Sequence, residues 1–184
     1  RSVNKFDFKY GRVDIRAKAA PGDGMWSAVW MMPTDTTYGT WAAGGEIDIM
    51  EVVNAGTDNQ GVFMAAHYGF EWPLNQITSE GADVSDASDW HTYSLEWSGD
   101  YLRWFVDGEH LRTVSKDVYY SYYFKDNTDG YQLASNPSAP FDRDFHLLVN
   151  LAVGGVGPGV EVDPSAVPGA VCYTHLTLPT KSTV

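Results

Sequence analysis

The sequence predicts an all-β protein built as a sandwich of two antiparallel sheets. Short segments in which polar and apolar residues alternate recur along the 184-residue chain, for example at residues 90–97 and 101–106. Turn residues separate these segments, and Asp107-Gly108 suits the type I′ turn of a β-hairpin. No segment shows the 3.6-residue period of a helix. Short alternating strands with turn signals between them are typical of a two-sheet β-sandwich.

The first half of the chain supplies four predicted strands, at residues 6–18, 25–32, 46–53 and 61–68. The first alternates polar with apolar or aromatic residues, as a half-buried antiparallel strand does. The second follows a turn at residues 21–24 and is nearly all apolar, which predicts a strand buried on both faces. A polar loop at residues 34–45 leads into the third strand.

The second half supplies strands at residues 90–97, 101–106, 109–114 and 145–153. The last is apolar and is predicted to be buried, with Asn150 as a polar residue that needs hydrogen-bond partners there. Residues 69–89 are expected to form a long loop, which is a usual place for ligand contacts. Residues 116–144 are rich in tyrosine and are either a surface excursion or a binding loop.

Composition narrows the class of protein and ligand. The length suits one domain, and a net charge of −12 argues against nucleic acid or an anionic membrane surface as partner. No apolar run approaches the roughly 20 residues of a membrane span. The single cysteine, Cys172, excludes an internal disulfide and a cysteine-built zinc site. Seven Trp and eleven Tyr suit a ligand that is part apolar and part hydroxyl.

Three carboxylates lie in the strand predicted at residues 46–53, although acidic residues are depleted in strands. Glu46 and Asp48 share one face because side chains alternate, whereas Glu51 has the opposite parity. A β-bulge near Ile49-Met50 would return Glu51 to the face of the other two. Crowded carboxylates have separated proton affinities, as a nucleophile and an acid/base require.

Structural explanations compete with catalysis for each of these residues. The carboxylates also fit a solvated strand face or part of a calcium site. Trp26 and Trp30 fall on one face of their strand, where they serve either core packing or a stacking platform. A lone histidine such as His67 is more often a hydrogen-bonded structural residue than a catalyst.

The segment Glu46-Ile47-Asp48-Ile49-Met50-Glu51 resembles the Glu-x-Asp-x-x-Glu motif of glycoside hydrolase family 16, in its bulged-strand form. Flanking segments agree with the family and occur in its order, so the resemblance covers roughly residues 1–165. These segments are residues 8–12, 24–31, 67–69, 90–97 and 141–155.

This resemblance implies a β-jelly-roll sandwich of two antiparallel sheets with a substrate cleft on its concave sheet. It also implies a retaining endo-hydrolase of β-linked glycans, with the laminarinase-like β-1,3-glucanases as the most similar group. The partner would then be a neutral polysaccharide, which suits an acidic protein. Retaining glycosidases use two carboxyl groups about 5–5.5 Å apart, and two Glu flanking an Asp on a curved strand fit that requirement.

The resemblance assigns roles to individual residues. Glu46 is implied as the nucleophile, Asp48 as its neighbouring helper and Glu51 as the acid/base. Asp48 would hold a proton or hydrogen bond beside Glu46, so that the carboxylates do not all ionise together. The residues expected to bind sugar are Trp26, Trp30, His67 and Asn150.

Both ends of the chain depart from the family pattern. Gly157 stands where relatives commonly carry a cleft-wall tryptophan, and the opening and closing strands of the family are missing. We therefore expect an N-terminally truncated catalytic sandwich at residues 1–171 and an atypical tail, frameshifted or foreign, at residues 172–184. Such a sandwich is expected to be poorly soluble or marginally folded. A structural calcium occurs in the family, but we expect no metal and no cofactor here.

Other functions stay open at this point. A non-hydrolytic β-glucan-binding protein on the same fold is the main alternative, and a structural sandwich with a calcium-binding carboxylate patch is another. Among substrates, mixed-linkage β-1,3-1,4-glucan and galactans follow β-1,3-glucan. We expect a monomer with no nucleic-acid or membrane partner. A polymeric substrate implies a secreted or periplasmic protein.

Overall fold

The computed structural model describes residues 1–125, 130–154 and 173–177. These residues form strands and no helix, and therefore no helix long and apolar enough to cross a membrane. The strands are β1 (Asp7–Phe8), β2 (Gly11–Lys18), β3 (Met25–Pro33), β4 (Glu46–Val53), β5 (Gly61–Tyr68), β6 (Gln76–Gly81), β7 (His91–Trp97), β8 (Tyr101–Val106), β9 (Glu109–Ser115), β10 (Tyr122–Lys125), β11 (Gly130–Leu133), β12 (Phe145–Val153) and β13 (Tyr173–Thr177).

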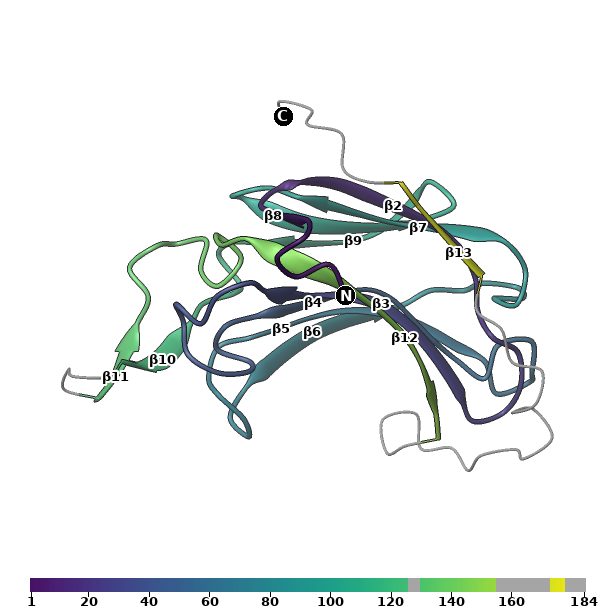
Figure 1. Cartoon of the computed structure of the whole chain (residues 1–184), viewed down its shortest axis with the longest axis horizontal. Helices are drawn as coiled ribbons and strands as arrows, with labels where there is room; N and C mark the ends of the chain where they lie inside the picture. Colours follow the sequence, from purple (N-terminus) through teal and green to yellow (C-terminus); the bar gives the residue numbers. More distant parts are fainter. Residues whose placement is uncertain (126–129, 155–172, 178–184) are drawn as a thin grey trace.

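Two antiparallel sheets stack face to face, as predicted (Figure 1). The larger sheet has the strand order β1-β12-β3-β4-β5-β6, and the smaller has the order β13-β2-β7-β8-β9. The short hairpin β10-β11 forms a separate ribbon that projects beyond the sandwich. The jumps in order, such as β12 beside β3, bring distant parts of the sequence together in one sheet.

The hydrophobic core lies between the sheets. Alternate residues of β2, including Val13 and Ile15, are buried against apolar residues of the larger sheet such as Val29 and Ile47. Burying one such aliphatic side chain stabilises the fold by about 1.5–3 kcal/mol. Because one face of the larger sheet is committed to this core, its other face is free to carry a site.

Several local predictions are confirmed. Strands β5, β8 and β12 have the predicted bounds, and the hairpin between β8 and β9 turns at Asp107 and Gly108. Both turn residues have positive φ, 50° and 84°, as a type I′ turn requires. The predicted bulge is present as well. Asp48 pairs with Trp30 and Met50 with Val29, so Ile49 is the extra residue in β4.

The prediction of a continuous loop at residues 69–89 is wrong, because β6 lies within it. This edge strand pairs with β5 through its backbone, while its side chains are largely exposed and, apart from Ile77, polar. It therefore lacks the apolar alternation that reveals a half-buried strand. The tyrosine-rich stretch at residues 116–144 likewise contains the hairpin β10-β11.

The predicted burial of β3 and β12 is partly wrong. In β3 one face is in the core, whereas Trp26 and Trp30 on the other face are only partly buried. In β12 only the first three residues are buried, and Asn150, expected to be buried, is exposed. Trp26, Trp30 and Asn150 share the outer face of the two paired strands, which borders an open depression rather than a second layer. Val149 and Val153 lie on the opposite face of β12 and are also exposed.

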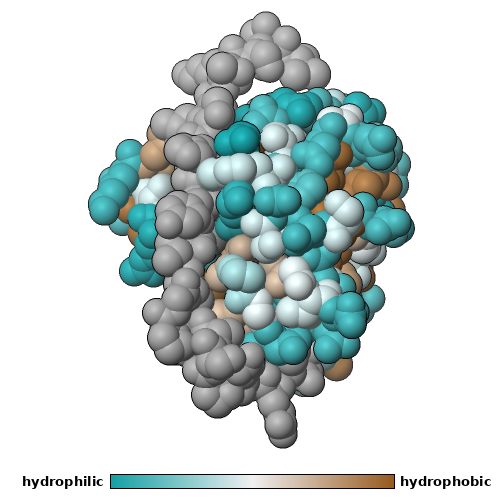
Figure 2. All heavy atoms as spheres, turned by 90° about the vertical axis from the view of Figure 1, so that its right-hand side faces the viewer, coloured by the Kyte–Doolittle hydropathy of each residue, from teal (hydrophilic) through white to brown (hydrophobic). Residues whose placement is uncertain are grey.

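The end of the chain contributes one strand to the smaller sheet. Tyr173–Thr177, which falls within the expected tail at residues 172–184, pairs antiparallel with β2. The division of the chain at residue 171 stays a prediction, and both Cys172 and Gly157 lie outside the described residues. Figure 2 shows the side of the molecule near β13, where hydrophilic residues predominate over the described surface.

Candidate active site

All seven predicted site residues gather on the outer face of the larger sheet. One depression of about 200 Å³ contains six of them, and its lining residues are Trp26, Ala28, Trp30, Glu46, Asp48, Glu51, Asn150 and Ala152. The seventh, His67, extends from β5 toward the carboxyl groups of β4. The adjacent strands β12, β3, β4 and β5 thus bring residues from four separate parts of the sequence to one site.

The bulge in β4 places the three carboxyl groups. Without the extra residue Ile49, Glu51 would face the core instead of the depression. Trp104 of β8 supports the backbone at the bulge from the core side. Its indole Nε1 donates a hydrogen bond of 2.9 Å to the carbonyl oxygen of Asp48 from within the core.

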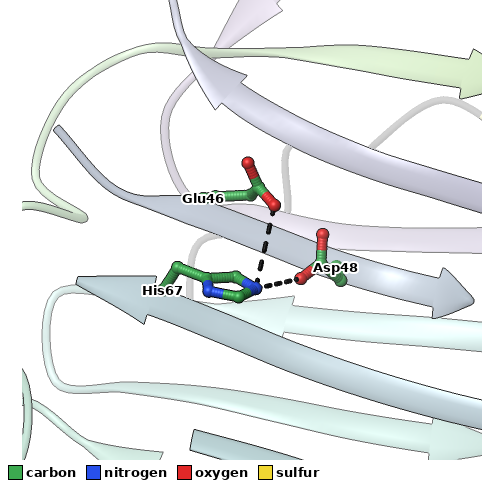
Figure 3. Close-up of side chains that lie close together, drawn as sticks. All are labelled: Glu46, Asp48 and His67. Carbon is green, nitrogen blue, oxygen red and sulfur yellow. Dashed lines mark ion pairs between the residues drawn. The ribbon is translucent and has the colours of Figure 1, made fainter. Parts of the chain in front are cut away.

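Glu46, Asp48 and His67 lie close together in the site (Figure 3). The Nε2 atom of His67 lies 3.3 Å from Oδ2 of Asp48 and 3.8 Å from Oε1 of Glu46. Asp48 is only 3% exposed, and its Oδ2 has no hydrogen-bond partner. The interpretation of these carboxylates as a solvated strand face is therefore excluded.

Tryptophan side chains hold the remaining polar groups. Trp26 donates a hydrogen bond of 3.1 Å from Nε1 to Oε1 of Glu51. Trp30 donates one of 2.7 Å to Oδ1 of Asn150, which leaves the amide nitrogen of Asn150 available to a ligand. Both indoles thus line the depression and fix a neighbour at the same time, so these tryptophans do not belong to the core.

Two further tryptophans at the site were not predicted. Trp41 donates a hydrogen bond of 2.8 Å to Oε2 of Glu46, and its ring lies 5.4 Å from that of His67. Its position five residues before Glu46 was the available signal, but the surrounding loop is polar and without periodicity. Trp72, from the loop before β6, lies 6.0 Å from Trp41 and is 71% exposed, so it extends the aromatic surface outward.

Burial dominates the electrostatics of the carboxyl groups. Burial, followed by repulsion from Asp48, raises the pKa of Glu46 to about 7. Burial, with repulsion from Glu51, raises the pKa of Asp48 well above its ordinary value. Burial also raises the pKa of Glu51, against the opposing effect of the Trp26 hydrogen bond. Protons are therefore retained in this cluster near neutral pH, and an acid beside a base is available.

The same group offers donor atoms to a metal ion. One ligand atom each from Glu46, Asp48 and His67 lie within 4.8 Å of one another. Ca²⁺ prefers six to eight oxygen ligands, so two carboxylates and an imidazole nitrogen suit it poorly. Among the described residues, these donors fit a transition metal better than they fit calcium.

A β-sandwich whose open sheet carries buried carboxyl groups between indole rings has the features of a carbohydrate-active protein. The model of the glycosyl hydrolases family 16 matches residues 1–136, so the chain belongs to this family. The fold is accordingly the β-jelly roll of that family, which confirms the predicted fold class.

Individual relatives agree with this membership. The chain is 44% identical, over 83% of its length, to glucan endo-1,3-beta-glucosidase A1 of Niallia circulans. It is 36% identical, over 84% of its length, to a beta-1,3-glucan-binding protein of Penaeus monodon. The laminarinase structure from Rhodothermus marinus matches with a TM-score of 0.75 and 33% identity, covering 95% of this chain and 67% of that one. The chain spans only 21% and 45% of the lengths of the two curated relatives.

Proposed function

We propose that the protein is a retaining endo-hydrolase of β-1,3-linked glucan of the laminarin type. The observation that carries this proposal is the placement of Glu46, Asp48 and Glu51 side by side in one tryptophan-lined depression. The relative named glucan endo-1,3-beta-glucosidase and the laminarinase structure support the choice of substrate.

The first step of the proposed reaction breaks the glycosidic bond. The ionised Glu46 attacks the anomeric carbon while Glu51, in its acid form, gives its proton to the leaving oxygen. The products are a glycosyl ester on Glu46 and a free chain end. In the second step Glu51, now ionised, takes a proton from water, the water oxygen attacks the anomeric carbon, and Glu46 leaves as a carboxylate. Configuration at the anomeric carbon is retained.

The neighbours of each carboxyl group suit these roles. The hydrogen bond from Trp41 to Oε2 orients Glu46 and stabilises its ionised form. Burial and repulsion from Asp48 raise the pKa of Glu46, so Glu46 and Asp48 are not both ionised until the pH approaches neutrality. Trp26 orients Glu51, and its position in the depression also lets its ring contact a sugar face.

Sugar recognition is assigned to Trp26, Trp30, His67 and Asn150. An indole face complements the C–H face of a pyranose, and the free amide nitrogen of Asn150 donates to a hydroxyl. The exposed Trp72 lies one ring beyond Trp41, so a glucan chain longer than the depression would meet it. A polymer bound across an open sheet is cleaved internally, which favours endo action.

The decisive experiment measures reducing-sugar release from laminarin by the wild type and by Glu46→Gln. Loss of the nucleophile should lower kcat on the order of 10³-fold or more. Glu109→Gln, an exposed residue of β9, is the matched control and should keep the wild-type rate. Proton NMR of the first products should show the β-anomer. An initial α-anomer would refute retention, and equal loss in both variants would refute the assigned nucleophile.

The glucan-binding relative from Penaeus monodon makes a non-hydrolytic glucan-binding protein the second candidate. Isothermal titration of laminarin oligosaccharides into the wild type separates the two functions. Binding without any sugar release by a folded protein would support this candidate and overturn the hydrolase.

We further propose that the protein acts as a monomer, without a cofactor, on a polysaccharide outside the cytoplasm. The polymeric substrate supports the location, because it does not enter cells intact. Activity that survives dialysis against EDTA and a monomer mass in sedimentation would agree with these proposals. If EDTA abolished the activity and calcium restored it, the proposal that the protein needs no cofactor would be contradicted.

A further inference from the structure

We propose that Glu46, Asp48 and His67 form a binding site for a divalent transition-metal ion, with Zn²⁺ as the probe. The proposal rests on the arrangement of their donor atoms and not on the hydrolytic activity. It assigns to the cleft a second ligand, one that is a small cation instead of a sugar.

The distance between the ligand atoms of His67 and Asp48 fits a tetrahedral ion. With bonds of about 2.0–2.1 Å, neighbouring ligand atoms of a tetrahedral zinc site lie about 3.3–3.4 Å apart. Nε2 of His67 and Oδ2 of Asp48 are separated by 3.3 Å, and Nε2 and Oε1 of Glu46 by 3.8 Å. All three atoms point toward one another from adjacent strands (Figure 3). All three ligand atoms lie within 4.8 Å of one another, so the Glu46 carboxyl group would have to move inward to complete three corners of the tetrahedron.

A second observation points to a ligand at this place. Oδ2 of Asp48 is buried and has no hydrogen-bond partner, which is an unfavourable state for a carboxyl oxygen. A cation bound between Asp48 and His67 would satisfy it. The fourth corner opens into the depression, where water would complete the coordination.

The surroundings set the expected strength of the site. The hydrogen bond from Trp41 fixes Oε2 of Glu46 and leaves Oε1 for the metal, as an outer-shell partner does. Nδ1 of His67 is buried and lacks the partner that metal-bound histidines usually have. We therefore expect micromolar binding, weaker than that of structural zinc sites. Hard cations such as Ca²⁺ and Mg²⁺ should bind much more weakly, because they favour oxygen ligands.

Occupancy would inhibit hydrolysis if Glu46 is the nucleophile, since its attacking oxygen would be a metal ligand. Zn²⁺ and a laminarin oligosaccharide should then compete. The binding itself is measured independently, so its failure and the failure of the proposed hydrolysis are distinguishable.

The test is calorimetric titration of ZnCl₂ and CaCl₂ into the folded wild type and four variants. His67→Gln and Asp48→Asn should each weaken Zn²⁺ binding by about tenfold or more. His110→Gln, an exposed histidine of β9, and Cys172→Ser, which removes the single thiol, should leave it unchanged. One Zn²⁺ bound per chain with this pattern supports the site. No binding, calcium binding of equal strength, or loss in His110→Gln or Cys172→Ser but not in His67→Gln overturns it.

A spectroscopic measurement on the wild type keeps the proposal testable if a variant fails to fold. Co²⁺ in a tetrahedral site has intense visible bands, whereas octahedral Co²⁺ is pale. We expect the intense bands, and we expect Zn²⁺ to abolish them. A weak octahedral spectrum at saturating Co²⁺ would refute the three-ligand geometry.

Discussion

At the scale of single residues, Glu46 is the group whose environment is most finely balanced. Burial and the neighbouring Asp48 raise its pKa to about 7, whereas His67 and the Trp41 hydrogen bond act in the opposite direction. Glu46 and Asp48 therefore titrate as a pair, and a proton leaves the pair near neutral pH. The proposed nucleophile must be ionised, so this pair determines the acidic limb of the activity profile.

Replacing Asp48 by Asn should move that acidic limb. Repulsion from Asp48 raises the pKa of Glu46, and a neutral amide removes this effect, so Glu46 ionises at lower pH. We expect the acidic limb of kcat/KM on laminarin to shift down on the order of one pH unit, with a lower maximum. The Glu109→Gln control should keep the wild-type limb. If the acidic limb of Asp48→Asn stayed in place or moved to higher pH, repulsion by Asp48 would not be what raises the pKa of Glu46.

Glu46→Gln should stabilise the fold in neutral and mildly alkaline solution. The folded pKa of Glu46, about 7, lies above its ordinary value of 4.5, so the folded state binds this proton more tightly than the unfolded state. The stability contributed by the proton is complete below about pH 4.5 and is lost as the pH rises through 7. At pH 8 the variant should therefore unfold at a higher denaturant concentration than the wild type. Its free energy of unfolding should be higher by up to about 3 kcal/mol. At pH 4 the two proteins should have the same free energy of unfolding. A difference in stability that is largest at pH 4 would refute the argument.

At the scale of elements, the bulge in β4 is the feature that assembles the site. Its position followed from the sequence, because Glu51 has the wrong parity to join Glu46 and Asp48 unless one residue is inserted. Its support did not follow. Trp104 alternates with other buried residues of β8, and this pattern by itself predicts only a core position. The missed signal is chemical, since a buried indole N–H needs an acceptor.

Trp104→Phe tests this support. The substitution leaves the carbonyl of Asp48 without its donor, which should lower the free energy of unfolding by about 1–3 kcal/mol. It should also lower kcat, because the bulge that carries the carboxyl groups relaxes. Trp97→Phe is the matched control. Trp97 is equally buried and donates 2.9 Å to the carbonyl of Phe141, away from the carboxyl groups.

Denaturant unfolding and laminarin kinetics of the two variants separate the roles of these tryptophans. Both variants should lose similar stability, but only Trp104→Phe should lose kcat at saturating substrate. A proportional loss of activity in both would mean that Trp104 acts through general stability alone.

Strands could be predicted from the sequence where at least one of their faces is buried. They could not be predicted where both faces are exposed. Strands β5 and β8 alternate or are apolar, and their bounds were read correctly from the sequence. Strand β6 is held by backbone pairing at an edge, and its polar residues carry no periodic signal. Asn150 shows a third case. Its apolar flanks suggest a buried strand, but the open face that Asn150 borders exists only once β12 has paired with β3.

At the scale of the whole molecule, the two faces of the larger sheet have different environments. One face packs in the core, and the other carries the candidate site. The smaller sheet covers one face of the larger, and the opposite face is left open for the carboxyl groups and indole rings. The net charge of −12 is also a property of the whole molecule, because its electric field acts on a charged ligand before any contact forms. A neutral glucan approaches such a protein without an electrostatic barrier, whereas a polyanion is repelled.

This repulsion predicts a salt dependence that only a charged substrate should show. For a carboxymethylated β-1,3-glucan, kcat/KM should rise several-fold when ionic strength increases from about 0.01 M to 0.15 M, because the Debye length falls from about 30 Å to about 8 Å. For neutral laminarin, kcat/KM should stay nearly constant, so the neutral polymer is the control for any effect of salt on the enzyme itself. Equal responses of both substrates, or a fall with the anionic one, would show that local contacts in the depression outweigh the charge of the whole molecule.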